Sequence, residues 1–111
     1  MQIPGYEHAI IDKRKICEYL LNFCHPEGAS KARLLSKAGF SAACWEELDR
    51  ALREHLCGDA EIGKDSPFGV KYRVRGPLTG RYGAVMATSI WIVRNAESFP
   101  RLITVVPEAL S

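Results

Sequence analysis

The chain of 111 residues is 47% hydrophobic and 25% charged, and its formal net charge is +2. This length is typical of one domain (residues 1–111) with a single core, and this composition excludes long disordered stretches. Eight Lys/Arg and nine Asp/Glu in residues 1–60 sum to −1, whereas seven and four in residues 61–111 sum to +3. The mild basic bias of the second half suits a polyanion such as RNA, but it is too weak for a dedicated DNA-binding domain.

The sequence carries no recognisable targeting or membrane signal. Residues 1–8 lack the basic and apolar segments of a secretory signal. The most apolar stretch, residues 84–93, has about half the length of a membrane span and is interrupted by Thr88 and Ser89. We therefore expect a cytoplasmic protein that does not enter a membrane.

Four cysteines lie in or beside apolar helical patterns and form no C-x-x-C pair: Cys17, Cys24, Cys44 and Cys57. This arrangement favours reduced cysteines that pack as small hydrophobic residues over one disulfide or a zinc site. Cys24 directly precedes His25, but neighbours in sequence seldom direct their side chains at each other, so a catalytic thiol–imidazole pair is disfavoured. We expect no metal and no cofactor.

The chain is predicted to begin with amphipathic helices. The first spans residues 13–23 with Asp12 as its N-cap, and its apolar residues recur at i, i+3, i+4 and i+7. The run His25-Pro26-x-Gly28 then breaks the helix, because proline disfavours helical backbone in the residue before it. A second helix begins near residue 29 or 30 and ends at Gly39, in the usual C′ position. The stripe of the first helix comprises Ile16, Tyr19, Leu20 and Phe23.

A third helix is expected over residues 42–56, with Ser41 as its N-cap and Gly58 after its end. Its acidic residues gather near the start, while Arg53 and His55 lie near the end, which suits the helix dipole. We place His55 on the exposed end of this helix. The apolar stripe comprises Trp45, Leu48, Leu52 and Leu56.

The second half of the chain changes to a period of two, which predicts strands. The helical half (residues 12–56) is thus followed by a sheet half (residues 60–107). The predicted fold is α+β, with three N-terminal helices on one face of a mostly antiparallel sheet of three to four strands. The strands span residues 70–74, 84–93 and 101–106, with a turn at 76–80 and a loop at 59–68 that holds at most a short strand at 60–62.

Two polar residues beside the second helix are candidates for chemistry. His25, at the exit of the first helix, either caps the preceding carbonyl groups or acts as a general acid or base, since an imidazole titrates near neutral pH. Lys31 lies in the first turn of the second helix, where the helix dipole disfavours a cation. It is either a solvated surface lysine or, beside the free N–H groups of the helix start, a contact to phosphate.

Cations also alternate along the first long strand. Lys71, Arg73 and Arg75 share one face, and Arg81 follows across the turn. They form either the solvated face of an edge strand, where Lys and Arg discourage aggregation, or a patch that follows an RNA backbone and weakens steeply with salt. Trp91 lies either in the core or beside this patch as an RNA-binding residue.

Thr88, Arg101 and Thr104 complete the candidate set, although their spacing conflicts with a regular strand. Thr88 and Trp91 differ by three positions, as do Arg101 and Thr104. The members of each pair therefore point to opposite faces of a regular strand. A site that contains all of them requires a bulge or an end-on geometry.

The chain resembles a family of small bacterial domains that occur alone or as the C-terminal module of polymorphic toxins. The likeness spans roughly residues 8–107, and these domains look like members of the barnase/RelE/colicin-type ribonuclease fold. The runs that carry it are Tyr19-Leu20-Leu21-Asn22, His25-Pro26-x-Gly28-x-x-Lys31-Ala32, Gly39-Phe40, Gly69-x-Lys71-Tyr72, Gly76-Pro77-Leu78-Thr79-Gly80, Trp91-Ile92-Val93 and Pro100-Arg101-Leu102-x-Thr104.

The resemblance implies metal-independent RNA cleavage, in which a 2′-hydroxyl attacks the adjacent phosphate. It would make His25 the acid and base, Lys31 and Arg101 a phosphate clamp, and Thr88 and Thr104 hydrogen-bond donors. It also implies RNA as the ligand and a cognate immunity or antitoxin protein as a partner.

The main alternative is a non-catalytic module that binds RNA or a protein through the cationic strand face. A housekeeping or defence role and an inactive copy of the enzyme are further alternatives. A metal site built from His25 and Cys24 has no supporting spacing. The position of His25 discriminates between these hypotheses, because a cleft shared with Lys31 and Arg101 favours the enzyme and a place in solvent more than about 10 Å from them excludes it.

Overall fold

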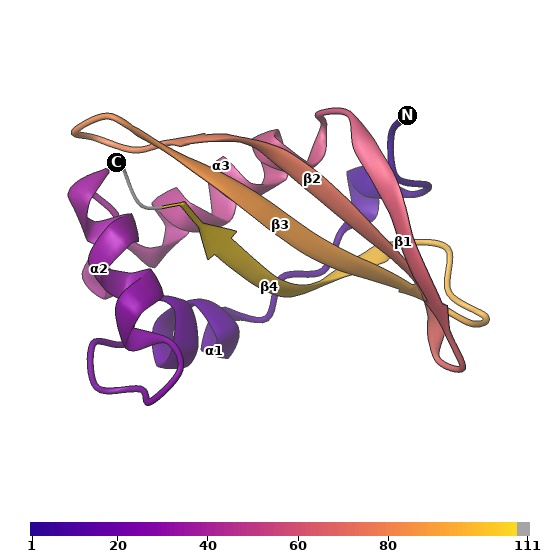
Figure 1. Cartoon of the computed structure of the whole chain (residues 1–111), viewed down its shortest axis with the longest axis horizontal. Helices are drawn as coiled ribbons and strands as arrows, with labels where there is room; N and C mark the ends of the chain where they lie inside the picture. Colours follow the sequence, from indigo (N-terminus) through magenta and orange to yellow (C-terminus); the bar gives the residue numbers. More distant parts are fainter. Residues whose placement is uncertain (109–111) are drawn as a thin grey trace.

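The structure is a computed structural model that describes residues 1–108 (Figure 1). Helical segments come first in the chain and strands follow, which confirms the predicted order. The helical segments are η1 (Tyr6–His8), α1 (Lys13–Lys15), η2 (Ile16–Leu20), α2 (Ala29–Lys37), η3 (Ala42–Cys44) and α3 (Trp45–Leu56). The strands are β1 (Ala60–Ser66), β2 (Gly69–Thr79), β3 (Ala84–Arg94) and β4 (Pro100–Pro107).

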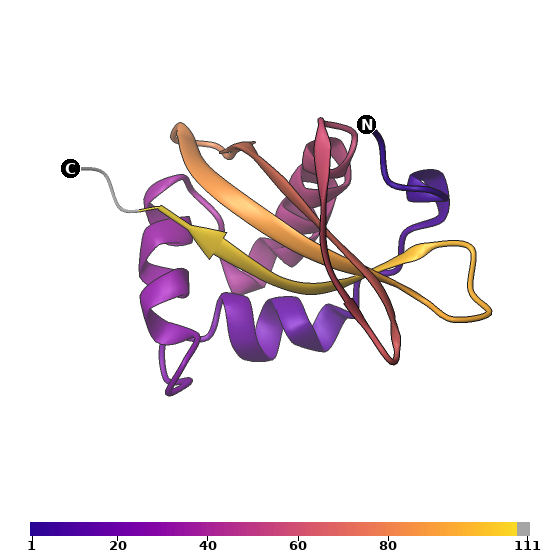
Figure 2. The same cartoon turned by 45° about the vertical axis from the view of Figure 1, so that its right-hand side comes forward.

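The strands form one antiparallel sheet in the order β1-β2-β3-β4, so each strand pairs with its neighbour in sequence. In Figure 1, α3 lies behind the twisted sheet, and α1 and α2 lie beside β4. Figure 2 shows the same arrangement turned about the vertical axis. Within residues 1–108 the opposite face of the sheet carries no helix, and we call it the outer face. The predicted α+β fold is confirmed.

The core lies between the sheet and the helices. Leu48, Leu52 and Leu56 of α3 are fully or almost fully buried, as the predicted stripe required, and Trp91 of β3 is fully buried. Full burial of one leucine side chain contributes about 1.5–3 kcal/mol to the stability of the folded state. Trp45, also in the predicted stripe, is half-buried and packs against the margin of the core.

The first helix is shorter than predicted. It ends at Leu20 through one π-type turn, in which Leu21 N–H donates to Ile16 O at 2.9 Å. Asp12 caps its start as predicted, because its carboxylate accepts a backbone N–H of the first turn. Phe23 therefore leaves the apolar stripe and is 56% exposed. Such π turns change the direction of the side chains that follow and recur at functional sites.

His55 is buried, which corrects its predicted place on an exposed helix end. Its Nε2 lies 3.0 Å from Gly76 O and 3.1 Å from Ala87 O, and its Nδ1 lies 2.8 Å from Ser89 Oγ. Trp91 Nε1 donates to the same Ser89 Oγ at 2.8 Å. The inward-facing serine of β3 therefore gives the imidazole and the indole a shared partner, and burial of both rings leaves no ring nitrogen unsatisfied.

β1 and β2 are longer than the sequence indicated. β1 extends over seven residues, and β2 continues through Gly76-Pro77, which the sequence had placed in a turn. The tight turn lies further on, where Gly80 N–H donates to Gly83 O at 2.8 Å. Pro77 is tolerated because β1 pairs with β2 only as far as Val74, so no ladder hydrogen bond on that side is lost.

A β-bulge changes the direction of side chains along β4. The pairing of β3 with β4 shifts by one residue at Ile103. Leu102 and Val105 are both buried although they are three positions apart. Arg101 and Thr104 consequently both turn away from the core, through the kind of bulge that their spacing required.

All four cysteines are free thiols, and none of them is fully buried, since Cys17 and Cys44 are half-buried. Cys24 and Cys57 are exposed, since both lie beyond the last buried turn of a helix. The predicted burial is therefore wrong for these two. Every helix in residues 1–108 is too short or too polar to cross a membrane.

Candidate functional site

Lys31 is the centre of a polar cluster that joins three separate elements. Its Nζ donates to Tyr19 Oη and to Thr104 Oγ1, both at 2.8 Å. Tyr19 comes from η2, Lys31 from α2 and Thr104 from β4. All three side chains are half-buried. The fold thus brings together polar groups that are far apart in the sequence.

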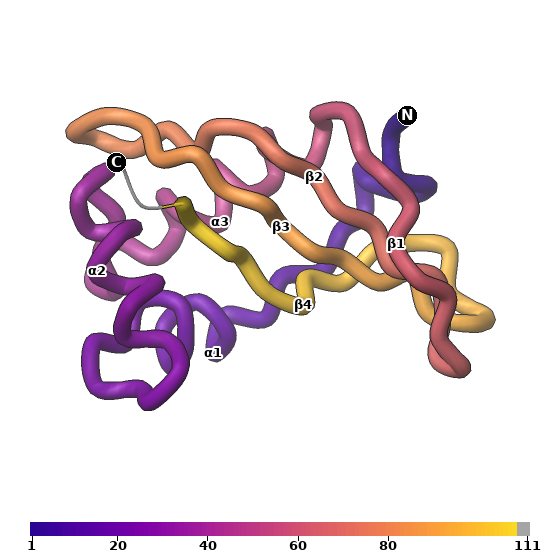
Figure 3. Tube along the Cα trace, in the orientation of Figure 1, coloured from indigo at the N-terminus to yellow at the C-terminus, as the bar shows by residue number. Residues whose placement is uncertain are grey.

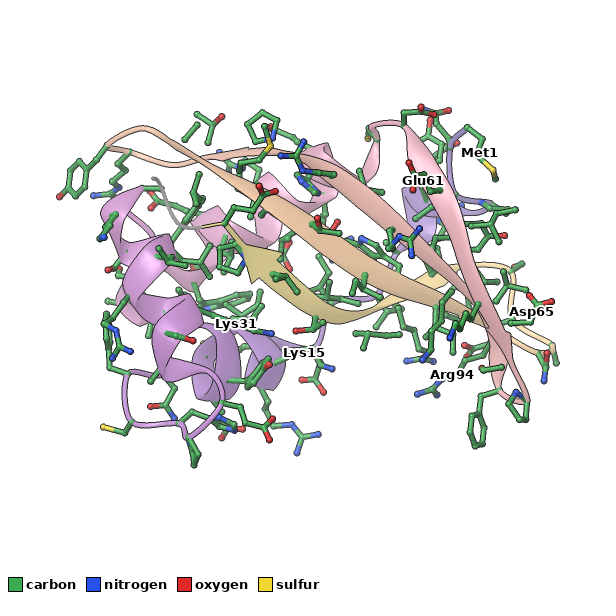
Figure 4. All side chains as sticks on the ribbon, in the orientation of Figure 1. Met1, Lys15, Lys31, Glu61, Asp65 and Arg94 are labelled. Atoms are coloured by element: carbon green, nitrogen blue, oxygen red, sulfur yellow. The ribbon has the colours of Figure 1, made fainter. Side chains whose placement is uncertain are left out.

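Lys15 extends this cluster along β4. Its Nζ donates to Ile103 O at 2.6 Å, and Ile103 directly precedes Thr104. Figure 4 shows Lys15 and Lys31 in the same corner of the molecule, where the first two helices meet β4. Lys15 and Tyr19 are four residues apart and so lie on one side of their helix. We call Lys15, Tyr19, Lys31 and Thr104 the lysine cluster.

Two backbone features position the cluster. Gly28 lets α2 begin directly against η2, because a Cβ at this position would lie 2.1 Å from Tyr19 O. Any side chain there would push the start of α2 outward and separate Lys31 from Tyr19. The bulge at Ile103 supplies the third partner, since it turns Thr104 out of the buried face of β4.

The two lysines of the cluster differ from five of the arginines in how their charge is balanced. Within residues 1–108, neither Lys15 nor Lys31 has a carboxylate oxygen within 4 Å, and both donate to neutral oxygens. Two half-buried ammonium groups with neutral partners leave a net positive charge, which favours an anion at this place. Arginines paired with a carboxylate at 2.7–3.2 Å are Arg53, Arg73, Arg75, Arg81 and Arg101.

The phenol of Tyr19 is activated by its neighbours. Burial and the negative charge of Glu27 raise the pKa of Tyr19, but hydrogen bonds with Lys31 and Thr104 and the charge of Lys31 outweigh these effects. The pKa of Tyr19 therefore lies below its ordinary value of 10. A lowered pKa increases the fraction of phenolate at neutral pH, and a phenolate can accept a proton.

His25 lies against Tyr19 with its acceptor nitrogen already occupied. The two rings meet edge to face, with centroids 4.9 Å apart. His25 Nδ1 accepts hydrogen bonds from the backbone N–H groups of Glu27 and Gly28, both at 3.0 Å. These donors place the proton on Nε2, so neither ring nitrogen has a lone pair free for a substrate proton. His25 thus caps the loop that follows it and not the preceding carbonyls, and an acid–base role would require its Nδ1 to leave these two donors.

Arg101 is separate from the lysine cluster. It donates to both carboxylate oxygens of Glu97, at 3.0 and 2.8 Å, and its guanidinium lies 5.3 Å from the centre of the Phe99 ring. Its charge is therefore compensated, and it forms no hydrogen bond with Lys31 among residues 1–108. In the same range Arg101 and Lys31 share no hydrogen-bond partner, whereas Lys15 contacts β4 at the residue before Thr104.

The predicted RNA-binding face is only partly available. Lys71, Arg73 and Arg75 share the outer face as the alternation indicated. Arg73 pairs with Glu61 at 3.2 Å, however, and Arg75 donates to both carboxylate oxygens of Glu108, at 2.8 and 3.0 Å. These acidic partners come from other strands or strand ends, so sequence alternation along β2 alone does not reveal them.

The remaining candidates lie elsewhere. Arg81 turns toward α3, where its Nε donates to both carboxylate oxygens of Glu47, at 2.7 and 3.1 Å. Trp91 is fully buried, which contradicts its predicted contact with RNA. Thr88 lies on the outer face opposite Arg75 and therefore faces away from Trp91. Of the five residues predicted to be catalytic, the structure joins Lys31 and Thr104 directly and places His25 beside them.

A protein-family profile described as a domain of unknown function (DUF6883) matches residues 2–109. The chain belongs to this family. The matched region includes every residue of the lysine cluster and nearly the whole DUF6883 fold described above. A search of curated proteins and a search of solved structures both found no match.

Two residues of the lysine cluster, Lys15 and Tyr19, were missed by sequence reasoning. Tyr19 fitted the apolar stripe of the first helix, and Lys15 fitted its solvated side. One signal was present, because a lysine and a tyrosine four residues apart can serve one ligand. Their common partners in β4 were hidden, since the direction of Thr104 depends on the bulge at Ile103.

Proposed function

We propose that this DUF6883 domain is a metal-independent ribonuclease of the toxin type, which cleaves RNA by attack of a 2′-hydroxyl on the adjacent phosphate. The observation that supports it best is Lys31, a half-buried ammonium held between the hydroxyls of Tyr19 and Thr104, without a carboxylate within 4 Å in residues 1–108. An RNA phosphate supplies the missing negative charge. Lys15 gives the same phosphate a second cation.

Tyr19 acts as the base in this mechanism. Its lowered pKa makes the phenolate accessible, and the phenolate removes the proton of the 2′-hydroxyl. The 2′-oxygen forms a bond to phosphorus, and the bond from phosphorus to the 5′-oxygen breaks. Lys31 Nζ gives a proton to the departing 5′-oxygen, and the Tyr19 hydroxyl returns one to Lys31 across their 2.8 Å contact. The products are a 2′,3′-cyclic phosphate and a 5′-hydroxyl.

Lys15 and Thr104 stabilise the transition state. Negative charge builds on the non-bridging phosphate oxygens during the attack, and donors already fixed in place stabilise it without reorganisation. Lys15 uses one N–H for Ile103 O and keeps two for the phosphate. Loss of one such donor reduces kcat by about 10²–10³-fold in enzymes that use this kind of stabilisation.

The first experiment incubates the purified protein with transfer and ribosomal RNA in excess EDTA. Lys31→Met is compared with Lys37→Met, which removes an exposed lysine from the last turn of the same helix. We expect Lys31→Met to lose about 10²–10³-fold in rate and Lys37→Met to retain it. Mass spectrometry then identifies the cyclic phosphate. Intact RNA with the parent protein, or equal cleavage by both variants, contradicts the proposal.

The role assigned to His25 has its own test. In His25→Asn the side-chain oxygen can still accept the N–H groups of Glu27 and Gly28, so the loop before α2 stays closed. We expect the cleavage rate to fall by less than about tenfold, whereas removing a general acid or base costs about 10²–10⁴-fold. A loss in that larger range, with the thermal unfolding temperature unchanged, would restore His25 as the acid or base.

A second candidate function is binding without cleavage, of RNA or a protein, through the outer face. It is favoured by Lys71, an outer-face cation with no ion pair in residues 1–108, and by the absence of a covering helix there. Two variants distinguish the binding module from the ribonuclease. If RNA is bound but not cleaved, and Lys71→Gln weakens binding while Lys31→Met does not, the binding module replaces the ribonuclease.

A further inference from the structure

One stretch of β2 has no neighbouring strand on one side. β1 pairs with β2 only up to the Ala60–Val74 pair, whose flanking position sets Asp59 opposite Arg75, so residues 76–79 form an open edge in the part of the chain that the structure describes. Figure 3 traces β2 past the end of β1 toward its hairpin with β3. Gly80 marks the far end, because a Cβ there would lie 2.2 Å from Ala38 O. The open stretch is about 13 Å long, at 3.3 Å per residue.

The backbone groups of this edge face outward in a defined pattern. Gly80 N–H donates to Gly83 O across the hairpin, and Ala60 N–H donates to Met1 O, away from β2. Both bonds set the same alternation, in which the even-numbered residues of β2 direct their N–H and C=O groups toward β3. Ala60–Val74 is thus a pair without mutual hydrogen bonds, so the backbone of Arg75 lies opposite Asp59 and is not part of the open stretch. The remaining odd-numbered residues, Pro77 and Thr79, present one N–H and two C=O groups outward, since proline has no N–H.

Helix α3 lies beside the open edge and forms a groove with it. Two pockets of about 320 and 250 Å³ follow one another along this groove, and both are lined by Ala51, Glu54 and Thr79. One pocket extends to Gly58 and the other to Arg81. A strand added to the edge would direct every second side chain into these pockets.

Two charged residues of α3 line the groove without an ion pair in residues 1–108. Glu54 borders both pockets, and Arg50 borders the one near Arg81, whose own charge is paired with Glu47. Arg50 and Glu54 are one helical turn apart, about 6 Å along the axis. Alternate residues of a strand are about 6.6 Å apart, so one strand can place a basic side chain at Glu54 and an acidic one at Arg50.

We propose that the groove between α3 and residues 76–79 binds an extended peptide segment of a partner protein, with a basic and an acidic residue two positions apart. The peptide adds to the sheet as a strand, and its alternate side chains enter the two pockets. A second copy of this chain fits less well, because twofold pairing centred on Pro77 sets two residues without N–H opposite each other. Pro77 thus discourages self-association while the other edge groups stay free.

The test displays a library of random twelve-residue peptides and selects those that bind the whole protein. We expect enriched sequences to carry Lys or Arg two positions from Asp or Glu. Synthetic copies should protect the amide hydrogen of Thr79 from exchange. Thr79→Pro removes an outward N–H and should weaken binding about tenfold, whereas Thr79→Val keeps the N–H and should bind normally. Thermal unfolding confirms that both variants fold.

The charge match is tested with Glu54→Lys and Glu46→Lys, which reverse one charge inside the groove and one exposed charge on α3 outside it. We expect only Glu54→Lys to reject the selected peptides. The proposal is overturned if no peptide is enriched, if Thr79→Pro binds as well as the parent, or if protection appears elsewhere. Concentration-dependent protection of Thr79 without peptide would assign the edge to a second copy and would also overturn it.

Discussion

The lysine cluster and the outer face of the sheet both carry cations, but the two regions hold them differently. Lys15 and Lys31 donate to a carbonyl and to hydroxyls, whereas Arg73 and Arg75 donate to carboxylates. A count of charges along the sequence favours the outer face, which lies in the basic half of the chain. The tertiary structure favours the lysine cluster instead, because an anionic ligand is attracted to charge that the protein itself leaves unbalanced.

Burial strengthens the same contrast. Lys15 and Lys31 are half-buried, while Arg73 and Arg75 are exposed. Solvent and salt screen charges on the open outer face, and a partly enclosed site screens them less. The smaller number of cations in the lysine cluster therefore has the greater effect on a phosphate bound there.

Tyr19→Phe should have the largest effect, since it removes the base from the lysine cluster and leaves both lysines in place. We expect a loss of about 10²–10⁴-fold in RNA cleavage. In the parent the rate should rise with pH and level off below pH 10, because the phenolate is the reactive form and the pKa of Tyr19 is lowered. The pH–rate profiles of parent and variant measure this, and a rise that survives in Tyr19→Phe assigns the base to another group.

Gly28→Ala tests the position of Lys31 relative to Tyr19, because the substitution changes no charge. The added Cβ would meet Tyr19 O at 2.1 Å, so α2 must move away from η2. We expect a destabilisation of about 1–3 kcal/mol in chemical unfolding. The rate of RNA cleavage should fall by about 100-fold, since a displacement near 1 Å can cost that much. Full activity in a destabilised variant would show that the 2.8 Å contact between Lys31 and Tyr19 is not needed.

The double variant Glu61→Gln with Glu108→Gln should leave unbalanced positive charge on the outer face, as in the lysine cluster. It frees Arg73 and Arg75 from their carboxylates. We expect single-stranded RNA to bind a few-fold more tightly, and the slope of log affinity against log salt to steepen by about 1.4, or 0.7 for each new phosphate contact. Fluorescence anisotropy over a range of salt measures both. An unchanged slope means that these ion pairs do not limit RNA binding.

The smallest effect is expected from Glu97→Gln, which breaks the ion pair of Arg101. The hydrogen bond and charge of Arg101 hold the pKa of Glu97 below its ordinary value of 4.5, against the opposing effect of burial. A lowered pKa stabilises the folded state above the unfolded value, so the parent should unfold at a slightly higher temperature than the variant above about pH 4.5. The difference should vanish as the pH falls through the lower folded value. A difference that persists in acid would have a cause other than charge.

Much of the scaffold around the site was predictable from local patterns. The break at His25-Pro26-x-Gly28 located the start of α2, and Gly39 located its end, where a φ of 103° requires a residue without a Cβ. The same run placed Lys31 in the first turn of α2. These features depend on a few consecutive residues, because helix starts and stops are set by local backbone preferences.

The composition of the site was less predictable. His25 looked like an acid or base, yet the N–H groups of Glu27 and Gly28 occupy its acceptor nitrogen. Tyr19 looked like a core residue, yet its hydroxyl meets Lys31. Each outcome depends on what a polar atom contacts, and a single polar residue in a sequence does not reveal its partner.

The sequence by itself determined the order of helices and strands, the buried stripe of α3 and the position of Lys31 at the start of α2, since these follow from the spacing of apolar residues and from proline and glycine. Only the tertiary structure decided which charges are balanced and which residues meet Lys31. A one-residue bulge at Ile103 sets the direction of Thr104, and salt bridges between strands compensate Arg73 and Arg75. Such contacts join distant segments, so their geometry exists only once the chain has folded.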